Sequence, residues 1–207
     1  MLRHIIWDFD GTLFDTYPSM AGALFATLRE HGYNAPYEEV YALMKQSVPV
    51  AFDFYAQRME WSSGIESEYA ARRRGIETAA CMPYPGAAEL LRDIASCGRK
   101  NYIFTHRGST LWPMLDRHGL RGLFEECVTS ESGFARKPAP DGILYLMEKY
   151  GMAPAETVMV GDRELDVLSG INAGIVTCAY CDGSGTDIGC ADYVARDMAQ
   201  LRRILLG

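Results

Sequence analysis

Short apolar runs alternate along most of the chain with segments of helical spacing. Five runs have the length and continuity of buried parallel strands: residues 4–9, 101–105, 124–130, 157–162 and 174–180. Four helical patterns, over 87–98, 109–119, 139–151 and 164–174, each end in a glycine of the C-cap type. This alternation predicts an α/β fold with a parallel sheet and helices on both of its faces.

Residues 17–82 follow a different pattern, because they are helical in period and composition with no intervening strand. The segment MPYPG at 82–86 carries two prolines and a glycine, which favour a hinge where the chain returns to the sheet. We therefore expect a core formed by 1–16 and 83–207, with an inserted helical cap domain over 17–82.

Composition narrows the classes of function. Hydrophobic residues make up 48% of the 207 residues, which is enough for a packed core, and the formal net charge is −7. That charge argues against binding nucleic acid or an anionic membrane surface. No apolar run approaches the roughly 18–20 residues of a membrane span, and the opening residues do not resemble a signal peptide. Six scattered cysteines favour free thiols and a cytoplasmic location; the oligomeric state, monomer or dimer, is left open.

Polar residues follow the predicted strands at the points where the strands end. They are Asp8 and Asp10, Thr105 with His106 and Arg107, Lys137, Asp162 and Asp166. Sites in open α/β sheets form outside the carboxyl ends of the strands, near the point where strand order reverses. Core packing does not require this pattern, so the sequence predicts a functional site at this edge.

The residue types favour phosphoryl transfer assisted by a metal. Asp8, Asp10 and Asp162 supply hard oxygen ligands of the kind that Mg²⁺ prefers, and the cation would relieve the repulsion between neighbouring acids. One aspartate can then attack phosphorus, and a second can act as general acid and then general base. Thr105 and Lys137 can hold phosphoryl oxygens.

Four ordered motifs carry a family resemblance. DFDGTLFDT, the strand end at Thr105, Lys137 in RKPAP and GDRELD resemble the motifs of the haloacid dehalogenase-like (HAD) hydrolase superfamily. The chain is most similar to the phosphoglycolate-phosphatase-like branch, in which a helical cap follows the first motif. The resemblance implies a Rossmann-like core in which the first and fourth strands are adjacent.

The resemblance also implies roles for the motif residues. Asp8 would be the nucleophile and a metal ligand, and Asp10 would be the acid/base and bind the metal through its backbone carbonyl. Thr105 and Lys137 would bind the transferring phosphoryl group, and Asp162 would be a metal ligand.

The sequence also gives expected roles to five further positions. Asp166 would act from behind the metal ligands, by orienting metal-bound waters or Lys137. His106 departs from the small or amide residue usual in the family, and either contacts the substrate phosphate or caps the next helix. Arg107 either meets a substrate anion or lies in a surface turn. Lys45 and Ser47, between two predicted cap helices, are candidates for substrate specificity.

A run of arginines and a pair of cysteines do not need a functional explanation. The run Arg72–Arg74 lies on a predicted cap helix, where a solvated face is favoured over a phosphate or nucleic-acid contact. Cys178 and Cys181 have the spacing of half a zinc knuckle, but no fourth ligand is evident.

The predicted function is that of a Mg²⁺-dependent phosphatase acting on a small phosphorylated metabolite, with 2-phosphoglycolate as one candidate. A dehalogenase is disfavoured because that branch lacks an acid at the position of Asp10. A phosphonatase needs a cap lysine, and Lys45 is the only lysine before residue 100. A sugar-phosphate mutase uses the same acid/base aspartate and stays open. The complete motif set disfavours a non-catalytic binding protein.

Overall fold

The computed structural model describes residues 1–181 and 188–207, and the chain divides into two compact units. Met1–Phe14 and Pro83–Gly207 form one, here called the core unit, and Asp15–Met82 form the other, the cap unit. The first junction follows Phe14 rather than residue 16. The backbone N–H of Asp15 donates to the carbonyl of Met82 (N···O 3.3 Å), which ties the entering chain to the departing chain within the cap unit.

A six-stranded parallel sheet forms the centre of the core unit, with the strand order β3-β2-β1-β4-β5-β6. The strands are β1 (His4–Trp7), β2 (Lys100–Phe104), β3 (Phe124–Val128), β4 (Thr157–Gly161), β5 (Val176–Tyr180) and β6 (Tyr193–Ala195). β1 pairs with β2 on one side and β4 on the other, so the expected adjacency of the first and fourth strands is confirmed. Ile5, Ile6 and Trp7 are fully buried, because both faces of this strand are covered.

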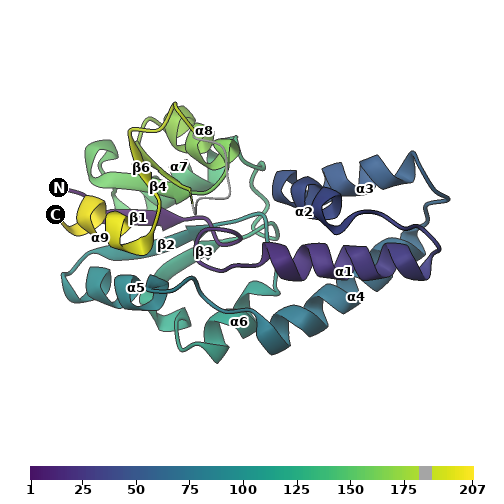
Figure 1. Cartoon of the computed structure of the whole chain (residues 1–207). Helices are drawn as coiled ribbons and strands as arrows, with labels where there is room; N and C mark the ends of the chain where they lie inside the picture. The colour runs from purple at the N-terminus through teal and green to yellow at the C-terminus, as the bar shows by residue number, and fades with distance from the viewer. Residues whose placement is uncertain (182–187) are drawn as a thin grey trace. The chain divides into compact units, whose positions relative to one another are not determined.

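Helices cover both faces of the sheet. They are α5 (Ala87–Ser96), α6 (Leu111–Arg117), α7 (Asp141–Tyr150), α8 (Glu164–Ala173) and α9 (Met198–Leu206), with short 3₁₀ turns at Arg121–Leu123 and Pro154–Glu156. Figure 1 shows α5 and α6 on one face and α7 and α8 on the other. The predicted α/β class and parallel sheet are confirmed.

Three features of the core unit differ from the sequence prediction. β6 and α9 were not predicted: β6 has only three residues, and α9 begins at a cap where the Asp197 carboxylate accepts from the N–H of Gln200 (2.7 Å). α6 begins at Leu111 rather than at residue 109, and Pro113 then falls in its first turn, where its missing N–H costs nothing. β3 ends at Val128, because a turn closed by Ser132 N–H on the Thr129 carbonyl follows it (3.0 Å).

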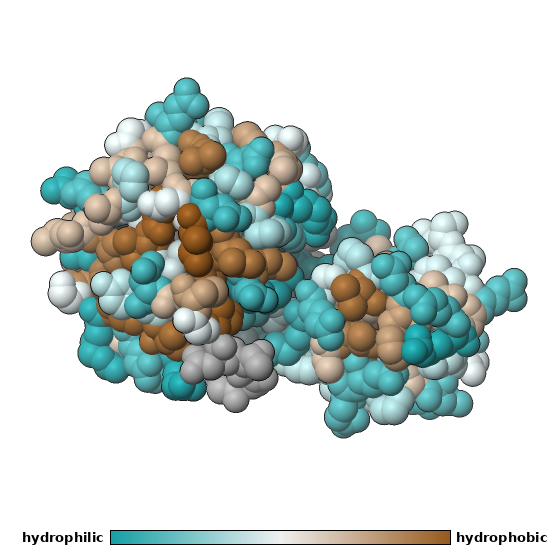
Figure 2. All heavy atoms as spheres, turned by 90° about the horizontal axis from the view of Figure 1, so that it is seen from above, coloured by the Kyte–Doolittle hydropathy of each residue, from teal (hydrophilic) through white to brown (hydrophobic). Residues whose placement is uncertain are grey.

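The cap unit consists of four helices, and no strand intervenes among its residues. They are α1 (Tyr17–Glu30), α2 (Tyr37–Gln46), α3 (Val48–Ala56) and α4 (Ser63–Ala80). α1 packs against α2 and α4, and buried side chains such as Leu24, Leu28, Met44 and Tyr55 form one apolar cluster. In Figure 2, hydrophilic residues cover most of the visible surface of this unit and apolar residues occupy a smaller central area. Nowhere in 1–181 or 188–207 is there a helix both long enough and apolar enough to cross a membrane.

Candidate active site

The carboxyl ends of the central strands lie level with one another. Trp7, the last residue of β1, is in register with Ile103 of β2 and Val160 of β4. The residues that follow these strands therefore meet at one edge, at the point where strand order changes direction. Asp8, Thr105 and Asp162 reach this edge from three different strands.

The DFDGT segment folds back on itself directly after β1. Gly11 has φ +84°, a left-handed conformation that favours glycine, and its N–H donates to the carbonyl of Phe14 (2.8 Å). Phe9 is fully buried and stacks on Phe14, with ring centroids 4.5 Å apart. The apolar residue between the two acids thus packs into the core, and Asp8 and Asp10 flank it at the sheet edge.

Lys137 lies at the centre of a buried ionic network. Its Nζ donates to Asp8 Oδ1 (2.5 Å), to Asp166 Oδ1 and to the Phe104 carbonyl (3.0 Å). All three charged side chains are essentially inaccessible to solvent. One ammonium group thus joins two carboxylates, one directly after β1 and the other in the first turn of α8.

This network shifts the pKa values of its members in different directions. Burial, reinforced by the negative charge of Asp166, raises the pKa of Asp8 to about 6 despite the nearby Lys137. Burial alone would also raise the pKa of Asp166, but Lys137 and Arg163 outweigh it and hold that pKa below its usual value. Burial opposes the charged form of Lys137, yet Asp166 and Asp8 raise its pKa above the usual range. The two carboxylates are therefore not equivalent.

Three carboxylates are placed to hold a cation. Asp8, Asp162 and Asp166 each offer an oxygen, and these atoms all lie within 4.8 Å of one another. Asp8 Oδ2 is buried and has no hydrogen-bond partner among the described residues. An unpaired buried carboxylate oxygen is costly, and a divalent cation would satisfy it. The donor set thus fits Mg²⁺, while the expected contribution of the Asp10 backbone carbonyl stays a prediction.

Asp166 occupies its position because Gly161 leaves room for it. A Cβ at Gly161 would lie 2.2 Å from Cβ of Asp166, so no larger residue fits at the end of β4 without displacing this acid. Asp166 Oδ2 also accepts from the backbone N–H of Arg163 (3.1 Å), at the beginning of α8. This cap turns Oδ1 toward Lys137, and the structure brings the two residues together as the sequence analysis expected.

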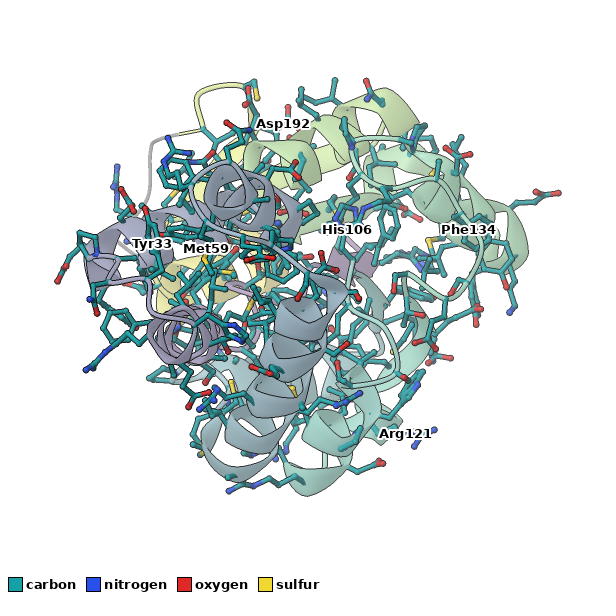
Figure 3. All side chains as sticks on the ribbon, turned by 90° about the vertical axis from the view of Figure 1, so that its right-hand side faces the viewer. Tyr33, Met59, His106, Arg121, Phe134 and Asp192 are labelled. Atoms are coloured by element: carbon teal, nitrogen blue, oxygen red, sulfur yellow. The ribbon has the colours of Figure 1, made fainter. Side chains whose placement is uncertain are left out.

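Thr105 and His106 each accept a hydrogen bond from a backbone N–H group at this edge. The Thr105 hydroxyl accepts from the backbone N–H of Arg107 (3.1 Å), and the backbone N–H of Lys137 donates to Nε2 of His106 (2.9 Å). Figure 3 shows His106 near the centre of the view. Since Nε2 accepts this hydrogen bond, His106 contacts the lysine loop through that atom, a role that the sequence did not predict. Phosphate binding by Thr105 and His106 stays a prediction.

Replacement of His106 by phenylalanine should test this contact. Burial and the positive charges of Lys137, Arg136 and Arg163 lower the pKa of His106 to about 3. The unfolded chain therefore binds a proton near pH 6.5 that the folded chain does not, so stability falls as pH drops from about 6.5 toward 3. The free energy of unfolding in urea, measured from pH 8 to pH 5, should depend less on pH in His106→Phe than in the wild-type protein. At pH 8 the variant should be less stable by about 1–2 kcal/mol, because the backbone N–H of Lys137 loses its acceptor. Identical pH dependence in both proteins would contradict this account.

Arg107 forms a buried ion pair with Asp10. Its Nε donates to both carboxylate oxygens (3.1 and 3.2 Å) and its Nη2 donates to Oδ1. The Arg107 side chain is 1% exposed, whereas that of Asp10 is 14% exposed. Arg107 therefore does not lie in the surface turn that was one of its two expected locations.

Two residues of this edge were missed by the sequence analysis. The hydroxyl of Thr12 donates to Asp162 Oδ1 (3.2 Å) and is fully buried, so it orients a candidate metal ligand. Arg163 places Nε 3.9 Å from Asp166 Oδ2 and adds positive charge beside the acids. Their positions inside DFDGT and GDRELD were the available signal.

The cap candidates have structural contacts of their own within the cap unit. Ser47 is the N-cap of α3, and its hydroxyl accepts from the N–H of Val50 (3.2 Å). Lys45 places Nζ 5.6 Å from the centre of the Tyr17 ring. Their roles in substrate specificity stay predictions.

The contacts of Arg72 and Arg73 and the burial of Cys178 bear on the other two features that the sequence analysis considered. Arg72 pairs with Glu30, and Arg73 Nε lies 2.7 Å from Glu77 Oε1, so these arginines bind acids of the same unit. Cys178 is buried, and burial raises the pKa of its thiol to about 12, which disfavours the thiolate that zinc requires.

Comparison with known proteins identifies the family. The model of the haloacid dehalogenase-like hydrolase family matches residues 5–180. The chain belongs to the haloacid dehalogenase-like hydrolase family. Among its relatives, a phosphoglycolate phosphatase of Vibrio parahaemolyticus is 27% identical over 99% of this chain and 96% of its own. Hexitol phosphatase A of Escherichia coli is 34% identical over 83% of this chain and 80% of its own.

A solved structure supports the fold of this HAD hydrolase. A haloacid dehalogenase-like hydrolase from Bacteroides fragilis superposes with a TM-score of 0.84, at 20% identity, over 97% of this chain and 100% of its own. The predicted superfamily and the Rossmann-like parallel sheet are confirmed. The chain is an enzyme of the hydrolase class, and the names of its relatives support a phosphatase.

Proposed function

We propose that this HAD hydrolase is a Mg²⁺-dependent phosphatase that hydrolyses small phosphate monoesters through an aspartyl-phosphate on Asp8. The observation that carries this proposal is the buried arrangement of Asp8, Lys137 and Asp166 beside Asp162, with Asp8 Oδ2 unpartnered among the described residues. Packing for stability alone does not require two buried acids on one lysine with a third acid beside them.

The balance of charge at this edge supports a phosphate substrate. Asp8, Asp10, Asp162 and Asp166 provide four negative charges when ionised. Lys137, Arg107 and Arg163 provide three positive charges, and His106 is neutral at pH 7. A bound divalent cation would change this balance from −1 to +1. The site would then attract a phosphate dianion rather than repel it.

The reaction would proceed in two displacements. An oxygen of Asp8 attacks phosphorus and the ester P–O bond breaks. Asp10, which must be protonated at this step, gives its proton to the departing alcohol oxygen. Asp10 then takes a proton from a water whose oxygen attacks the phosphoryl group, and the bond to Asp8 breaks to release inorganic phosphate. Lys137 stabilises the negative charge on Asp8 and on the transferring group. Bound Mg²⁺ would supply charge neutralisation between Asp8 and the incoming phosphate.

The proposal also covers the identity of the substrate and of the molecule that accepts the phosphoryl group. Relatives named for phosphoglycolate and hexitol phosphates make 2-phosphoglycolate and hexitol phosphates the first compounds to test. A mutase would use the same acids but pass the phosphoryl group from Asp8 to a second sugar hydroxyl. Release of inorganic phosphate from a hexose phosphate, without an isomeric sugar phosphate, would favour the phosphatase.

Purified protein should hydrolyse p-nitrophenyl phosphate and at least one metabolite phosphate in the presence of Mg²⁺. Activity should be lost on treatment with EDTA and return when Mg²⁺ is restored, because the three carboxylates need a cation to admit phosphate. Asp10→Asn should lower turnover of a metabolite phosphate by about 100-fold or more, since it removes the proton donor and acceptor. The protein should stay folded because the amide oxygen can still accept from Arg107, although the buried pair loses one of its charges. Activity that is indifferent to EDTA, or absent across the panel, would contradict the proposal.

A further inference from the structure

Arg107 is held in place by contacts on several sides. Its Nη1 donates to the Thr110 hydroxyl (3.1 Å) and approaches Sδ of Met114 (3.6 Å). Its guanidinium carbon lies 5.3 Å from the centre of the Phe9 ring. The Arg107 backbone is also fixed, since its N–H donates to Thr105 (3.1 Å). These contacts leave the guanidinium group little freedom of rotation.

This fixed guanidinium group donates hydrogen bonds to both oxygens of the Asp10 carboxylate. A planar guanidinium and a planar carboxylate that share several hydrogen bonds must lie in a defined relative orientation. Asp10 directly precedes Gly11, whose left-handed backbone turns the chain, and it lies beyond the end of β1. The hydrogen bonds from Arg107 therefore hold the Asp10 carboxylate in one orientation.

We propose that Arg107 is a positioning residue for Asp10, which sets the direction in which Asp10 presents its carboxylate to the leaving group and to the attacking water. This role rests on the proposed function. A guanidinium 1% exposed and already bound to Asp10 is poorly placed to receive a substrate anion, which was the other role expected for Arg107. General acid–base catalysis needs the carboxylate within hydrogen-bond reach of the proton it transfers, so misplacement by about 1 Å costs about 100-fold.

The proposal predicts a fall in kcat with little change in KM. Arg107→Gln should lower kcat for an alkyl phosphate by about 100-fold while KM changes by less than about threefold. Arg107→Lys keeps the positive charge but loses the planar set of N–H donors that binds both Asp10 oxygens, so it should also lower kcat. Arg121→Gln is a matched control, because Arg121 forms an exposed ion pair with Asp116 on the same unit and should leave kcat unchanged. A large rise in KM with unchanged kcat would indicate substrate binding and overturn the positioning role.

A double-mutant cycle with Asp10 gives the decisive test. If Arg107 acts through Asp10, then Arg107→Gln in the Asp10→Asn background should cost less than about threefold in kcat for the same alkyl phosphate. Equal losses in the two backgrounds would overturn the proposal. The doubly substituted protein removes both charges of the buried pair, so it avoids the unpaired buried charge that destabilises the single variants.

Chemical rescue separates positioning from a general effect on folding. Arg107→Ala should regain at least about tenfold in kcat on addition of guanidinium at millimolar concentration, with no gain for Arg121→Ala. Failure of rescue, in a variant that circular dichroism shows to be folded, would count against the role. If wild-type protein has no phosphatase activity, the proposed function fails and this role fails with it. If wild-type protein is active and Asp10→Asn lowers its turnover as expected, an Arg107→Gln variant with unchanged kcat overturns this inference alone.

Discussion

Replacement of Asp8 by asparagine is expected to abolish phosphatase turnover, by at least about a thousandfold, with the fold retained. The amide is nearly isosteric with the carboxylate but is not a nucleophile toward phosphorus, so no aspartyl-phosphate can form. The folded state should survive because Lys137 keeps Asp166 as its partner and the amide oxygen can still accept from Nζ. Steady-state kinetics with p-nitrophenyl phosphate and a metabolite phosphate would measure the loss.

A second measurement ties the loss to the nucleophile. Wild-type protein should trap beryllofluoride on Asp8 in the presence of Mg²⁺, observable by ¹⁹F NMR, and Asp8→Asn should not. Asp116→Asn is the matched control, since Asp116 is an exposed acid of the same unit that pairs with Arg121. Normal turnover in Asp8→Asn would refute the assignment of the nucleophile.

Replacement of Lys137 by methionine is expected to cost both activity and stability. Asp8 and Asp166 would then share a buried site without a cation, and removal of one partner from a buried ion pair costs about 3–5 kcal/mol. The loss should be larger at pH 8 than at pH 5, because protonation of Asp8, whose pKa is already raised to about 6, relieves the repulsion. Chemical unfolding at the two pH values would measure it.

A surface lysine provides the control for this variant. Lys149 pairs with Glu126 (2.8 Å) with its side chain 47% exposed, so Lys149→Met should lower stability far less than Lys137→Met. Added Mg²⁺ should restore part of the stability of Lys137→Met, since the cation would replace the missing positive charge between the carboxylates. Equal stabilities of the two lysine variants would show that the network does not stabilise the core.

The sequence predicted the elements of the fold where hydrophobic period and chain length agree. β1 and β4 are continuous apolar runs, and the helices between strands end at glycines with positive φ such as Gly151 and Gly174. β6 was missed because three residues give too short a run to show a period. α9 was missed with it, although Asp197 is a recognisable cap.

The pattern of strand ends also predicted which polar residues gather, because parallel strands in register end together. It did not predict the partners of those residues. His106 faces the backbone of Lys137, 31 positions away in sequence, and Arg107 faces Asp10, 97 positions away. Such pairs depend on how two loops lie against each other in the folded sheet. The periodicity of the sequence within each loop does not predict that arrangement.

The sequence by itself therefore determined the superfamily, the class of fold and the edge of the sheet where the acids and the lysine meet. Only the tertiary structure decided how those residues divide their contacts. The ammonium group of Lys137 binds both Asp8 and Asp166, and Asp8 Oδ2 has no hydrogen-bond partner among the described residues. Asp10 forms its ion pair with Arg107 instead. The physical reason is that motif spacing fixes where each loop starts, whereas burial and the competition of a few cations for several carboxylates fix which charges pair.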